Sequence, residues 1–508
     1  MSDNTTNNKR IAKNTLFLYF RMLLTMCVGL YASRVVLNVL GVSDYGVYNV
    51  VGGIVNMLAF FNVGMTGATQ RFISYELGKG NKERLETTFC TSVLTHIIIA
   101  ILIIIVAEIV GVWLISTQLN IPGERIIAAN WVLQFSILTF SLSVLIIPYN
   151  SCIIAHEHMN IYAYISILEA LLKLGIVFCL MFATVDTLIL YAILVFCVQL
   201  IINGIYFIYC KKHFKECHYK YVYDKSLLKQ MFSFAGWGMI GNTGFTLKDQ
   251  GSNIILNLFF GTGVNAARGI ATQVNNIINS FAANFSMAMN PQITKLYAVG
   301  NVDESMKLVY AGSRYTFFLL SLIAIPFLIN SDYVLHLWLG IVPEYTNMFV
   351  YIILLGSLIY SLAHTVATAI HATGYVKWLQ ISLSIILLSE LPIAYVILKL
   401  GGQPYHALLP SLITIPISVI VRFIILRHYV SKYSLREYLY GCVFRCLALF
   451  SICFILSYYV HSLMSPDSFV TLVVSSTIAI MITLSFIFVF GINKNERTFV
   501  ANRVRKVF

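Results

Sequence analysis

Charged side chains are scarce in this sequence. Only 11% of its 508 residues are Asp, Glu, Lys or Arg, and its 21 acidic residues are outnumbered by 34 basic ones. Hydrophobic residues make up 58% of the chain, and the mean hydropathy is +0.81. These values lie far outside the range of soluble globular proteins. The composition therefore predicts a chain that lies mostly within a lipid bilayer.

Signatures of several other protein classes are missing as well. The sequence has no Walker A motif, so ATP hydrolysis by this chain is not expected. None of its ten cysteines falls in a segment expected outside the cell membrane, which argues against a disulfide framework. No sizeable outer loop, clustered carboxylate site or cofactor motif is visible, so an enzyme is not expected. No cleavage site follows the polar residues 1–13, and we expect the first span to remain as an uncleaved anchor.

Apolar segments of about twenty residues, the length that crosses a bilayer, recur along the chain. They predict an all-α polytopic membrane protein with about fourteen transmembrane helices. The expected spans are 15–38, 45–70, 90–115, 126–152, 161–184, 187–209, 231–258, 262–290, 309–330, 345–371, 376–399, 404–426, 438–461 and 468–491.

One stretch, residues 40–81, recurs 220 residues further along the chain. Two copies of a hydrophobic unit in one orientation are typical of transporters. We therefore expect two pseudo-symmetric lobes of six helices, residues 1–210 and 231–427, joined by a basic cytoplasmic linker at 211–230. Two further helices and a basic tail occupy 428–508. The matched positions are Gly41 with Gly261, Asn56 with Asn276, Phe61 with Phe281, and Gly80-Asn81 with Gly300-Asn301.

The basic residues follow the topology that the spans imply. With the N-terminus in the cytosol, the cytosolic segments carry 24 lysines and arginines, and the outer segments carry only Arg125 and Lys399. This bias is the positive-inside pattern, which places both termini in the cytoplasm of a bacterial inner membrane. The net charge of +13 thus lies along one membrane face, and binding to nucleic acid is not needed to explain it.

Eight basic residues lie within the expected spans, where each costs about 2.5–3.5 kcal/mol at the bilayer centre. Lys173 follows Glu169 by four residues, so we expect an ion pair on one helix face. Arg314 and Arg422 are expected to snorkel to the cytosolic interface, and Arg445 to meet lipid headgroups. The remaining four are candidates for a cationic substrate cavity: Arg21, Arg34, Lys248 and Arg268.

A mainly cationic cavity indicates an anionic substrate, and a phosphorylated one fits the fork-shaped guanidinium of arginine. Arg268 is the first candidate, because it occupies the repeat position that Tyr48 holds in the first copy. Two acids are candidates for coupling to Na⁺ or H⁺. Asp249 lies in the seventh span, and Glu390 in the eleventh precedes Pro392, which disturbs that helix and frees backbone carbonyls. The alternative for Asp249 is neutralisation of a neighbouring base.

Several motifs resemble the polysaccharide-exporter, or Wzx-type, branch of the multidrug/oligosaccharidyl-lipid/polysaccharide (MOP) superfamily. The resemblance covers almost the whole chain. It implies a V-shaped, MATE-like pair of six-helix lobes. The motifs are Leu40-Gly41, Tyr45-Gly46-x-Tyr48, Arg71-Phe72, Gly78-Lys79-Gly80-Asn81 and Phe234-Ala235-Gly236-Trp237-Gly238.

The resemblance also implies roles for individual residues. Related lipid II flippases carry cavity arginines on spans one, two and eight. Arg21 or Arg34 and Arg268 match two of these, but span two has no arginine before Arg71 at its cytosolic end. Those relatives also have a sodium site among spans seven, eleven and twelve, which Asp249, Glu390 and Thr414 resemble.

The function expected from this resemblance is flipping of undecaprenyl-diphosphate-linked oligosaccharide across the inner membrane for O-antigen or capsule biosynthesis. Partners would be the lipid-linked glycan, membrane lipids and a polysaccharide polymerase, with no cofactor beyond a coupling ion. A cation-coupled multidrug antiporter of the same fold and a lipid II flippase are the alternatives.

The charge bias gives a prediction about topology. Reporter fusions after Lys229 and at the C-terminus should both report a cytosolic location, and a fusion near Pro343 a periplasmic one. Paired alkaline phosphatase and fluorescent protein reporters distinguish the two sides. A periplasmic C-terminus would contradict the fourteen-span topology.

Overall fold

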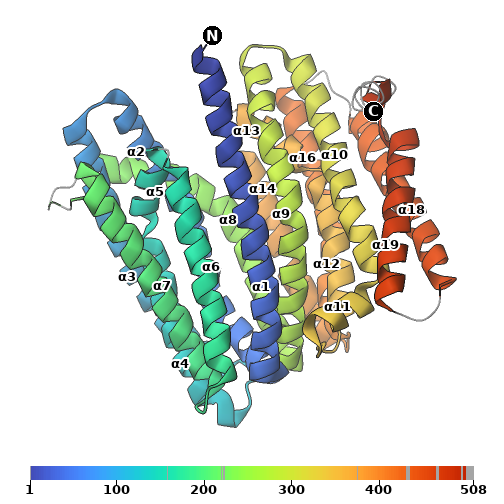
Figure 1. Cartoon of the computed structure of the whole chain (residues 1–508), viewed down its shortest axis with the longest axis horizontal. Coiled ribbons are helices and arrows are strands. Elements are labelled where there is room, and N and C mark those ends of the chain that lie inside the picture. Colours follow the sequence, from blue (N-terminus) through green and yellow to red (C-terminus); the bar gives the residue numbers. More distant parts are fainter. Residues whose placement is uncertain are drawn as a thin grey trace. The chain divides into compact units, whose positions relative to one another are not determined.

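A computed structural model of the chain shows an assembly of helices (Figure 1). It describes the backbone of residues 2–156, 158–218, 220, 224–373, 376–430, 435–464, 468–493 and 496–498. The described side chains begin at residue 23 and leave out 63, 78, 159, 234–235, 237–242, 283–284, 287–288, 291, 295 and 298. Within this part every regular element is a helix, which confirms the all-α class.

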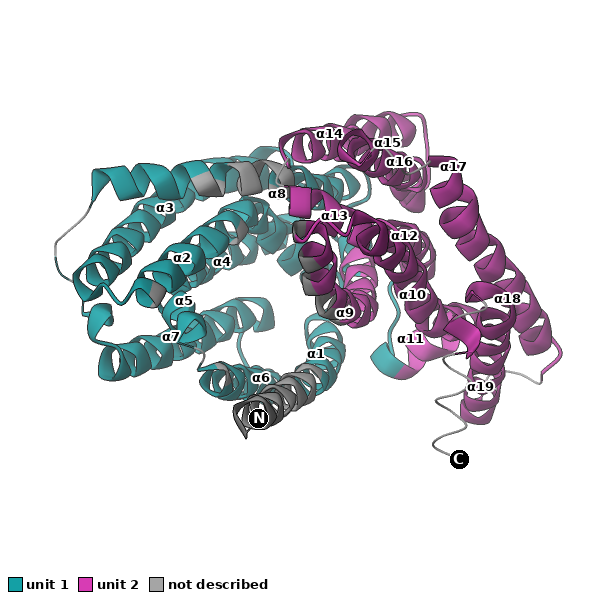
Figure 2. Cartoon of the chain, turned by 90° about the horizontal axis from the view of Figure 1, so that it is seen from above, with its two compact units in different colours: residues 1–266, 338–343 teal, residues 267–337, 344–508 magenta. Residues whose placement is uncertain are grey.

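The chain divides into two compact units (Figure 2), here called unit 1 and unit 2. Unit 1 comprises Met1–Ala266 and Trp338–Pro343, and unit 2 comprises Ala267–Leu337 and Glu344–Phe508. This division rests on contacts within each unit, so the lobe boundaries expected at the basic linker stay a prediction.

Unit 1 contains α1 to α8, and α9 begins in this unit and continues into unit 2. Their bounds are α1 (Ser2–Asn56), α2 (Phe60–Lys79), α3 (Lys82–Thr117), α4 (Ile126–Leu145), α5 (Ile147–Ala155), α6 (Met159–Met181), α7 (Thr187–His213), α8 (Lys225–Phe260) and α9 (Thr262–Ala298). Short 3₁₀ turns lie at Met57–Ala59, Gly123–Arg125 and Lys215–Cys217.

Unit 2 contains the rest of α9 and ten further helices, several of which are broken pairs. Their bounds are α10 (Val302–Ile329), α11 (Ser331–Leu339), α12 (Thr346–Ser361), α13 (His364–Thr373), α14 (Lys377–Leu388), α15 (Glu390–Lys399), α16 (Ser411–Tyr429), α17 (Leu435–Tyr438), α18 (Arg445–Ser462) and α19 (Phe469–Phe486). A 3₁₀ turn covers Pro404–Leu408, and π-helical turns cover Leu439–Phe444 and Ile487–Gly491.

The number of membrane-spanning helices can be compared with the sequence only over the described residues. Among these, ten helical stretches are long and apolar enough to span a membrane, or eleven if α12 and α13, bent by 42°, form one span. The first stretch, Leu23–Leu77, contains two of the expected spans, and α8 and α9, which are described only in part, are not among the ten. The count of fourteen is therefore not confirmed.

The internal repeat is visible in the backbone. Gly41 and Gly261, which the sequence aligns, have φ angles of +79° and +75°, and each begins a helical segment. A positive φ is costly for residues with a Cβ, so glycine is preferred at both places. Gly41 is the point at which α1 kinks. The repeat is therefore confirmed at its first pair of positions.

The last matched positions, Gly80-Asn81 and Gly300-Asn301, form the same helix junction twice. Gly80 and Gly300 have φ angles of +71° and +79°, and each follows the end of a helix. The next residues, Asn81 and Asn301, cap α3 and α10 by accepting a hydrogen bond from the backbone N–H three residues further on, at 3.1 and 3.3 Å. Asparagine is among the preferred N-cap residues. The repeat thus preserves both the glycine stop and the asparagine start.

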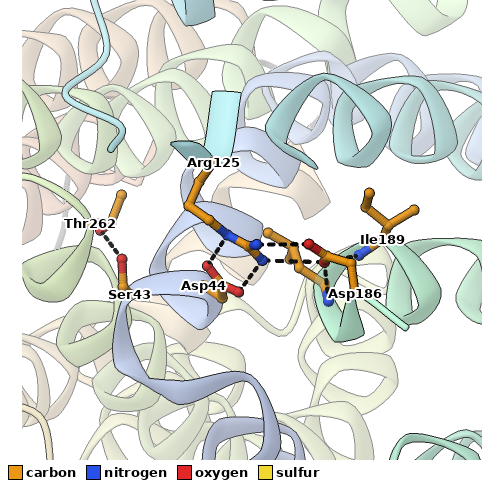
Figure 3. A network of polar contacts seen from close by, with 7 residues as sticks. Ser43, Asp44, Arg125, Asp186, Ile189 and Thr262 are labelled. Carbon is orange, nitrogen blue, oxygen red and sulfur yellow. Dashed lines mark hydrogen bonds and ion pairs between the residues drawn. The ribbon is translucent and has the colours of Figure 1, made fainter. Parts of the chain in front are cut away.

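In unit 1 the backbone of α1 approaches the start of α9 very closely. A Cβ atom placed on Gly46 would lie 1.9 Å from the Thr262 carbonyl oxygen. The Ser43 and Thr262 hydroxyls are joined by a hydrogen bond of 3.2 Å at the same contact (Figure 3). Only glycine fits at position 46 without moving one of these segments.

A chain of buried asparagines extends this contact. Asn257 donates to the Asn265 side-chain oxygen at 2.9 Å, and Asn265 donates to the side-chain oxygen of Asn253 at 2.7 Å. Asn253 donates to the Asn49 carbonyl of α1 at 3.2 Å, and the Asn257 side chain accepts from the Asn120 N–H at 2.8 Å. Buried amides are stable only when hydrogen-bonded. The network therefore fixes α1, α8 and α9 in one register.

Two intramembrane arginines fasten the C-terminal segment of unit 2. Arg314 on α10 forms an ion pair with Glu496 at 2.8 Å. Arg445, at the start of α18, donates to the carbonyls of Phe490 and Ile492 at 2.7 and 3.4 Å. Both side chains thus have partners that are distant in sequence. The snorkelling expected for Arg314 and the headgroup contact expected for Arg445 stay predictions. The ion pair expected between Lys173 and Glu169 is confirmed at 2.6 Å.

The Gly46 contact predicts a large effect from one methyl group. Gly46→Ala should lower the free energy of unfolding by at least about 1–3 kcal/mol, the usual cost of overpacking. Gly52→Ala in the same helix is the control, since a Cβ there meets nothing within 4 Å, and alanine favours helix by about 1 kcal/mol. Melting temperatures of the two purified variants test this difference. Equal melting temperatures would contradict the close approach.

Candidate functional site

A buried acid and a buried hydroxyl meet inside unit 2. Glu390 is the first residue of α15 and is 4% exposed, and Thr414 on α16 is 5% exposed. The Thr414 hydroxyl donates a hydrogen bond to the Glu390 Oε1 atom. The structure thus brings together two of the three residues that the sequence named for ion coupling, although they lie 24 positions apart.

Each of the two residues lies next to a proline. The helix that was expected over 376–399 is divided at Ser389 into α14 and α15, and Pro392 has no N–H to donate to the carbonyl of Leu388. In α16 Pro416 likewise leaves the carbonyl of Leu412 without its helical donor. Both helices therefore present backbone oxygen atoms close, in sequence, to the carboxyl–hydroxyl pair.

This arrangement supplies hard oxygen ligands with a single negative charge. Carboxylate, hydroxyl and carbonyl oxygens suit alkali cations, and a buried carboxylate also suits a proton. Among the described residues, no group of three or more His, Cys, Asp or Glu side chains is placed to hold a metal ion. The Glu390–Thr414 pair is thus chemically matched to Na⁺ or H⁺ rather than to a multivalent metal.

The third ion-coupling candidate, Asp249, lies in unit 1. It is half-buried on α8, and its carboxylate accepts a hydrogen bond from the Gln250 side chain at 3.1 Å. Glu390 and Thr414 belong to unit 2. The role of Asp249 beside them therefore stays a prediction.

The basic candidates are distributed over both units. Arg34 is exposed on α1 and Lys248 is half-buried on α8, both in unit 1. Arg268 on α9 belongs to unit 2 and is only 5% exposed. The side chain of Arg21 lies outside the described residues. A shared cavity for these four side chains stays a prediction.

The repeat partner of Arg268 has a different role. Tyr48 in α1 packs against Tyr191 of α7, with ring centroids 4.7 Å apart. An aromatic pair thus fills the first copy at the position where the second copy has a buried cation. The two halves are similar in backbone and different in charge at this point.

Sequence reasoning missed a charged cluster in unit 1. Figure 3 shows the Arg125 guanidinium between the carboxylates of Asp44 and Asp186. Arg125 donates to Asp44 Oδ1 at 2.8 Å and to Asp186 Oδ2 at 2.7 Å. The three residues come from the turn after the α1 kink, the turn before α4 and the N-cap of α7. Arg125 therefore joins three chain segments at one end of unit 1.

Asp186 carries two functions in this cluster. Its carboxylate also accepts from the backbone N–H groups of Leu188 and Ile189, at 3.0 and 3.2 Å, and so caps α7. Partial burial raises the pKa of Asp186, but the hydrogen bonds from Arg125 and from these N–H groups outweigh that effect and lower the pKa overall. The only signal in the sequence was that Arg125 is one of two basic residues in the outer segments.

Comparison with known proteins identifies the family. The family model described as "Polysaccharide biosynthesis protein" matches residues 11–297, more than half of the chain. The chain belongs to this polysaccharide biosynthesis family. The match confirms the resemblance seen in the sequence. No curated protein matches the chain at a significant level.

Solved structures with a similar fold include members of the MOP superfamily. A structure described as "Lipid II flippase MurJ, inward closed conformation" has a TM-score of 0.69 at 15% identity, covering 94% of this chain and 98% of that one. An inward-facing multidrug resistance MATE family transporter has a TM-score of 0.63 at 15% identity, covering 82% and 98%. A MOP superfamily transporter from Pyrococcus furiosus Vc1 (DSM3638) has a TM-score of 0.60 at 15% identity, covering 83% and 97%. At such identities the similarity shows a shared fold.

The Glu390–Thr414 pair predicts a specific response of this polysaccharide biosynthesis family member to sodium. Na⁺ at a hundred times its Kd should stabilise the purified protein by about 2.7 kcal/mol relative to K⁺ at equal ionic strength. Glu390→Gln should remove this stabilisation and Thr414→Val should reduce it. Glu437→Gln, at an exposed position of unit 2, is the matched control. If Na⁺ and K⁺ give the same melting temperature in the unchanged protein, the pair is not a sodium-specific site.

Proposed function

We propose that the chain is a flippase that moves undecaprenyl-diphosphate-linked oligosaccharide across the inner membrane for surface polysaccharide biosynthesis. The observation that carries this proposal is the family match over residues 11–297, on a fold that is similar to a lipid II flippase over 94% of this chain. The membrane-spanning composition and the absence of enzymatic motifs support a transport role.

The charge pattern supports an anionic, lipid-linked substrate. Arg268 on α9 is only 5% exposed, and its planar guanidinium suits phosphate oxygens. Charge-assisted hydrogen bonds to a diphosphate would contribute about 1.5–3 kcal/mol each. Arg21, Arg34 and Lys248 are the further candidates for the same anion. In this proposal the glycan stays in water and the polyprenyl tail stays in lipid.

Alternating access by the two repeat halves is the proposed mechanism. The matched glycines at Gly41 and Gly261 give both halves the same kinked entry, which suits two elements that move against each other. Opening on the cytosolic side would admit the diphosphate, and opening on the other side would release it. A coupling cation at Glu390 and Thr414, with Asp249 as a further candidate, would bias one of the two states.

A cation-coupled multidrug antiporter is the alternative, since a MATE family transporter is among the similar structures. Its substrates are usually cationic, whereas the intramembrane charges here are mostly basic. A lipid II flippase is a second alternative, and it is weakened because the second expected span has no arginine before Arg71. A polysaccharide polymerase is the proposed downstream partner.

Replacement of Arg268 tests the substrate site. In a strain that lacks its own flippase, Arg268→Ala should lower surface glycan by about tenfold or more, because one lost contact of 1.4 kcal/mol already corresponds to tenfold. Arg268→Lys should give a partial defect, since it keeps the charge and loses the planar fork. Surface glycan is measured by gel and antibody staining, and membrane abundance by blot.

The matched control is Lys307→Ala, which removes one positive charge from an exposed position at the start of α10. Normal glycan with Arg268→Ala at normal abundance would show that this residue is not the diphosphate anchor, and Arg21 would become the first candidate. If the unchanged chain restores no glycan and instead confers drug resistance, the antiporter is correct and the flippase proposal is wrong.

A further inference from the structure

Another buried arginine of unit 2, Arg422, has no acidic partner among the residues that the structure describes. Arg422 on α16 is 3% exposed, and no described carboxylate forms an ion pair with it. Its Nη2 atom donates one hydrogen bond, to the Tyr360 hydroxyl at 2.8 Å, while its Nε atom has no hydrogen-bond partner among the described residues. The expectation that Arg422 snorkels to the interface is therefore wrong, because protein surrounds the side chain.

The contacts present do not balance the cost of burying this charge. The guanidinium lies 4.5 Å from the centroid of the Tyr360 ring, a cation–π contact. Such a contact is weaker than the cost of taking one ion out of water. An arginine placed in this way is stabilised further if an anion approaches its free Nε–H edge.

Two further hydrogen-bond donors lie beside Arg422. The Tyr360 hydroxyl accepts from Arg422, so its own hydrogen is available to a second acceptor. The His364 ring lies edge-on to the Tyr360 ring, with centroids 5.4 Å apart. Both residues are half-buried, and they flank the 42° bend between α12 and α13. The bend therefore gathers a hydroxyl and an imidazole next to the buried guanidinium.

The surroundings of these three residues are basic in the sequence as well as in the structure. His371 on α13 lies within electrostatic range of Arg422, and Arg427 and His428 are exposed at the end of α16. The neighbouring segments 374–375 and 431–434 contain no acidic residue and one lysine. Glu437, the acidic residue that follows segment 431–434, is exposed.

We propose that Arg422, Tyr360 and His364 form a subsite in unit 2 that binds a phosphate group. The planar guanidinium, a hydroxyl and an imidazole are the donors that suit phosphate oxygens. Arg422 lies seven residues before the end of α16 at Tyr429, about 10 Å along a helix. The phosphate therefore belongs to one of two sources: a lipid-linked diphosphate or the headgroup of an anionic phospholipid. The subsite is separate from Arg268 and does not depend on translocation.

The test measures binding rather than transport. The full-length protein, purified in a maltoside detergent, is melted with increasing sodium pyrophosphate, against sodium sulfate of matched ionic strength. A parallel series uses nanodiscs of phosphatidylcholine with and without phosphatidylglycerol. The variants are Arg422→Met and Tyr360→Phe, and the matched control is Arg427→Met, which removes the same charge from an exposed position of the same helix.

We expect pyrophosphate to raise the melting temperature of the unchanged protein and of Arg427→Met in a saturable manner. Arg422→Met should raise the midpoint concentration by about tenfold or more, the loss expected for one charge-assisted contact. Its melting temperature without ligand should equal or exceed that of the unchanged protein, because an apolar side chain replaces an uncompensated charge. Tyr360→Phe, which removes one hydroxyl only, should raise the midpoint by a smaller factor and serves if Arg422→Met does not fold.

The outcomes show which of the two phosphate sources binds and whether the subsite exists. Stabilisation by pyrophosphate that Arg422→Met removes supports the diphosphate source, and stabilisation by phosphatidylglycerol alone that Arg422→Met removes supports the headgroup. Equal stabilisation in Arg422→Met, or no stabilisation by either probe, would overturn the subsite. Each of these results is independent of whether the chain restores surface glycan, so failure of the subsite and failure of the flippase proposal are separable.

Discussion

Backbone polar groups inside a hydrocarbon layer have no water to bond with, and this constraint governs where the helices break. At several breaks, a side chain from elsewhere donates to a backbone carbonyl. The Tyr438 hydroxyl donates to the Leu362 carbonyl between α12 and α13 at 2.8 Å, and Asn203 donates to the Leu142 carbonyl near the α4–α5 break at 2.6 Å. Arg445 donates to the carbonyls of Phe490 and Ile492, in and just after the π-helical turn that follows α19. A helix break is therefore tolerated where a neighbouring helix supplies a hydrogen-bond donor, so the position of each break depends on how the helices pack.

Buried charges also need partners, and leaving one without a partner costs more free energy than leaving a neutral polar group without one. Arg125 is shared by two carboxylates, and Arg314 is paired with Glu496. Each of these arginines joins chain segments far apart in sequence, and each is neutralised by the chain itself. Arg422 differs, since a tyrosine ring and hydroxyl are its described partners. Arg314 and Arg422 are similarly buried, at 7% and 3% exposed, so what faces the guanidinium distinguishes a structural arginine from the proposed ligand-binding one.

The sequence predicted features that depend on local chemistry. The repeat was found from glycines and asparagines, because positive φ angles and N-caps favour particular residue types wherever they occur. The i,i+4 pair of Lys173 with Glu169 was found for the same reason. The partner of Arg314 is 182 residues away and that of Arg422 is 62 residues away. Partners so far apart in the chain cannot be recognised from residue spacing, so Arg314 and Arg422 were both expected at the membrane interface. The division of the expected 345–371 span into α12 and α13 was also missed, because the helix breaks without a proline inside it.

The cation site and the proposed phosphate subsite share one helix. Thr414 and Arg422 lie eight residues apart on α16, about 12 Å along the axis and about 80° around it, with Pro416 between them. A ligand at either end acts on the same proline-interrupted segment, so a shift in α16 on cation binding would move the guanidinium that faces the phosphate. Coupling of this kind is reciprocal: if the cation changes the affinity for phosphate, phosphate changes the affinity for the cation by the same factor. A cation at Thr414 and Glu390 and a phosphate at Arg422 would thus act on the same helix, which offers a direct physical link between an ion gradient and an anionic lipid.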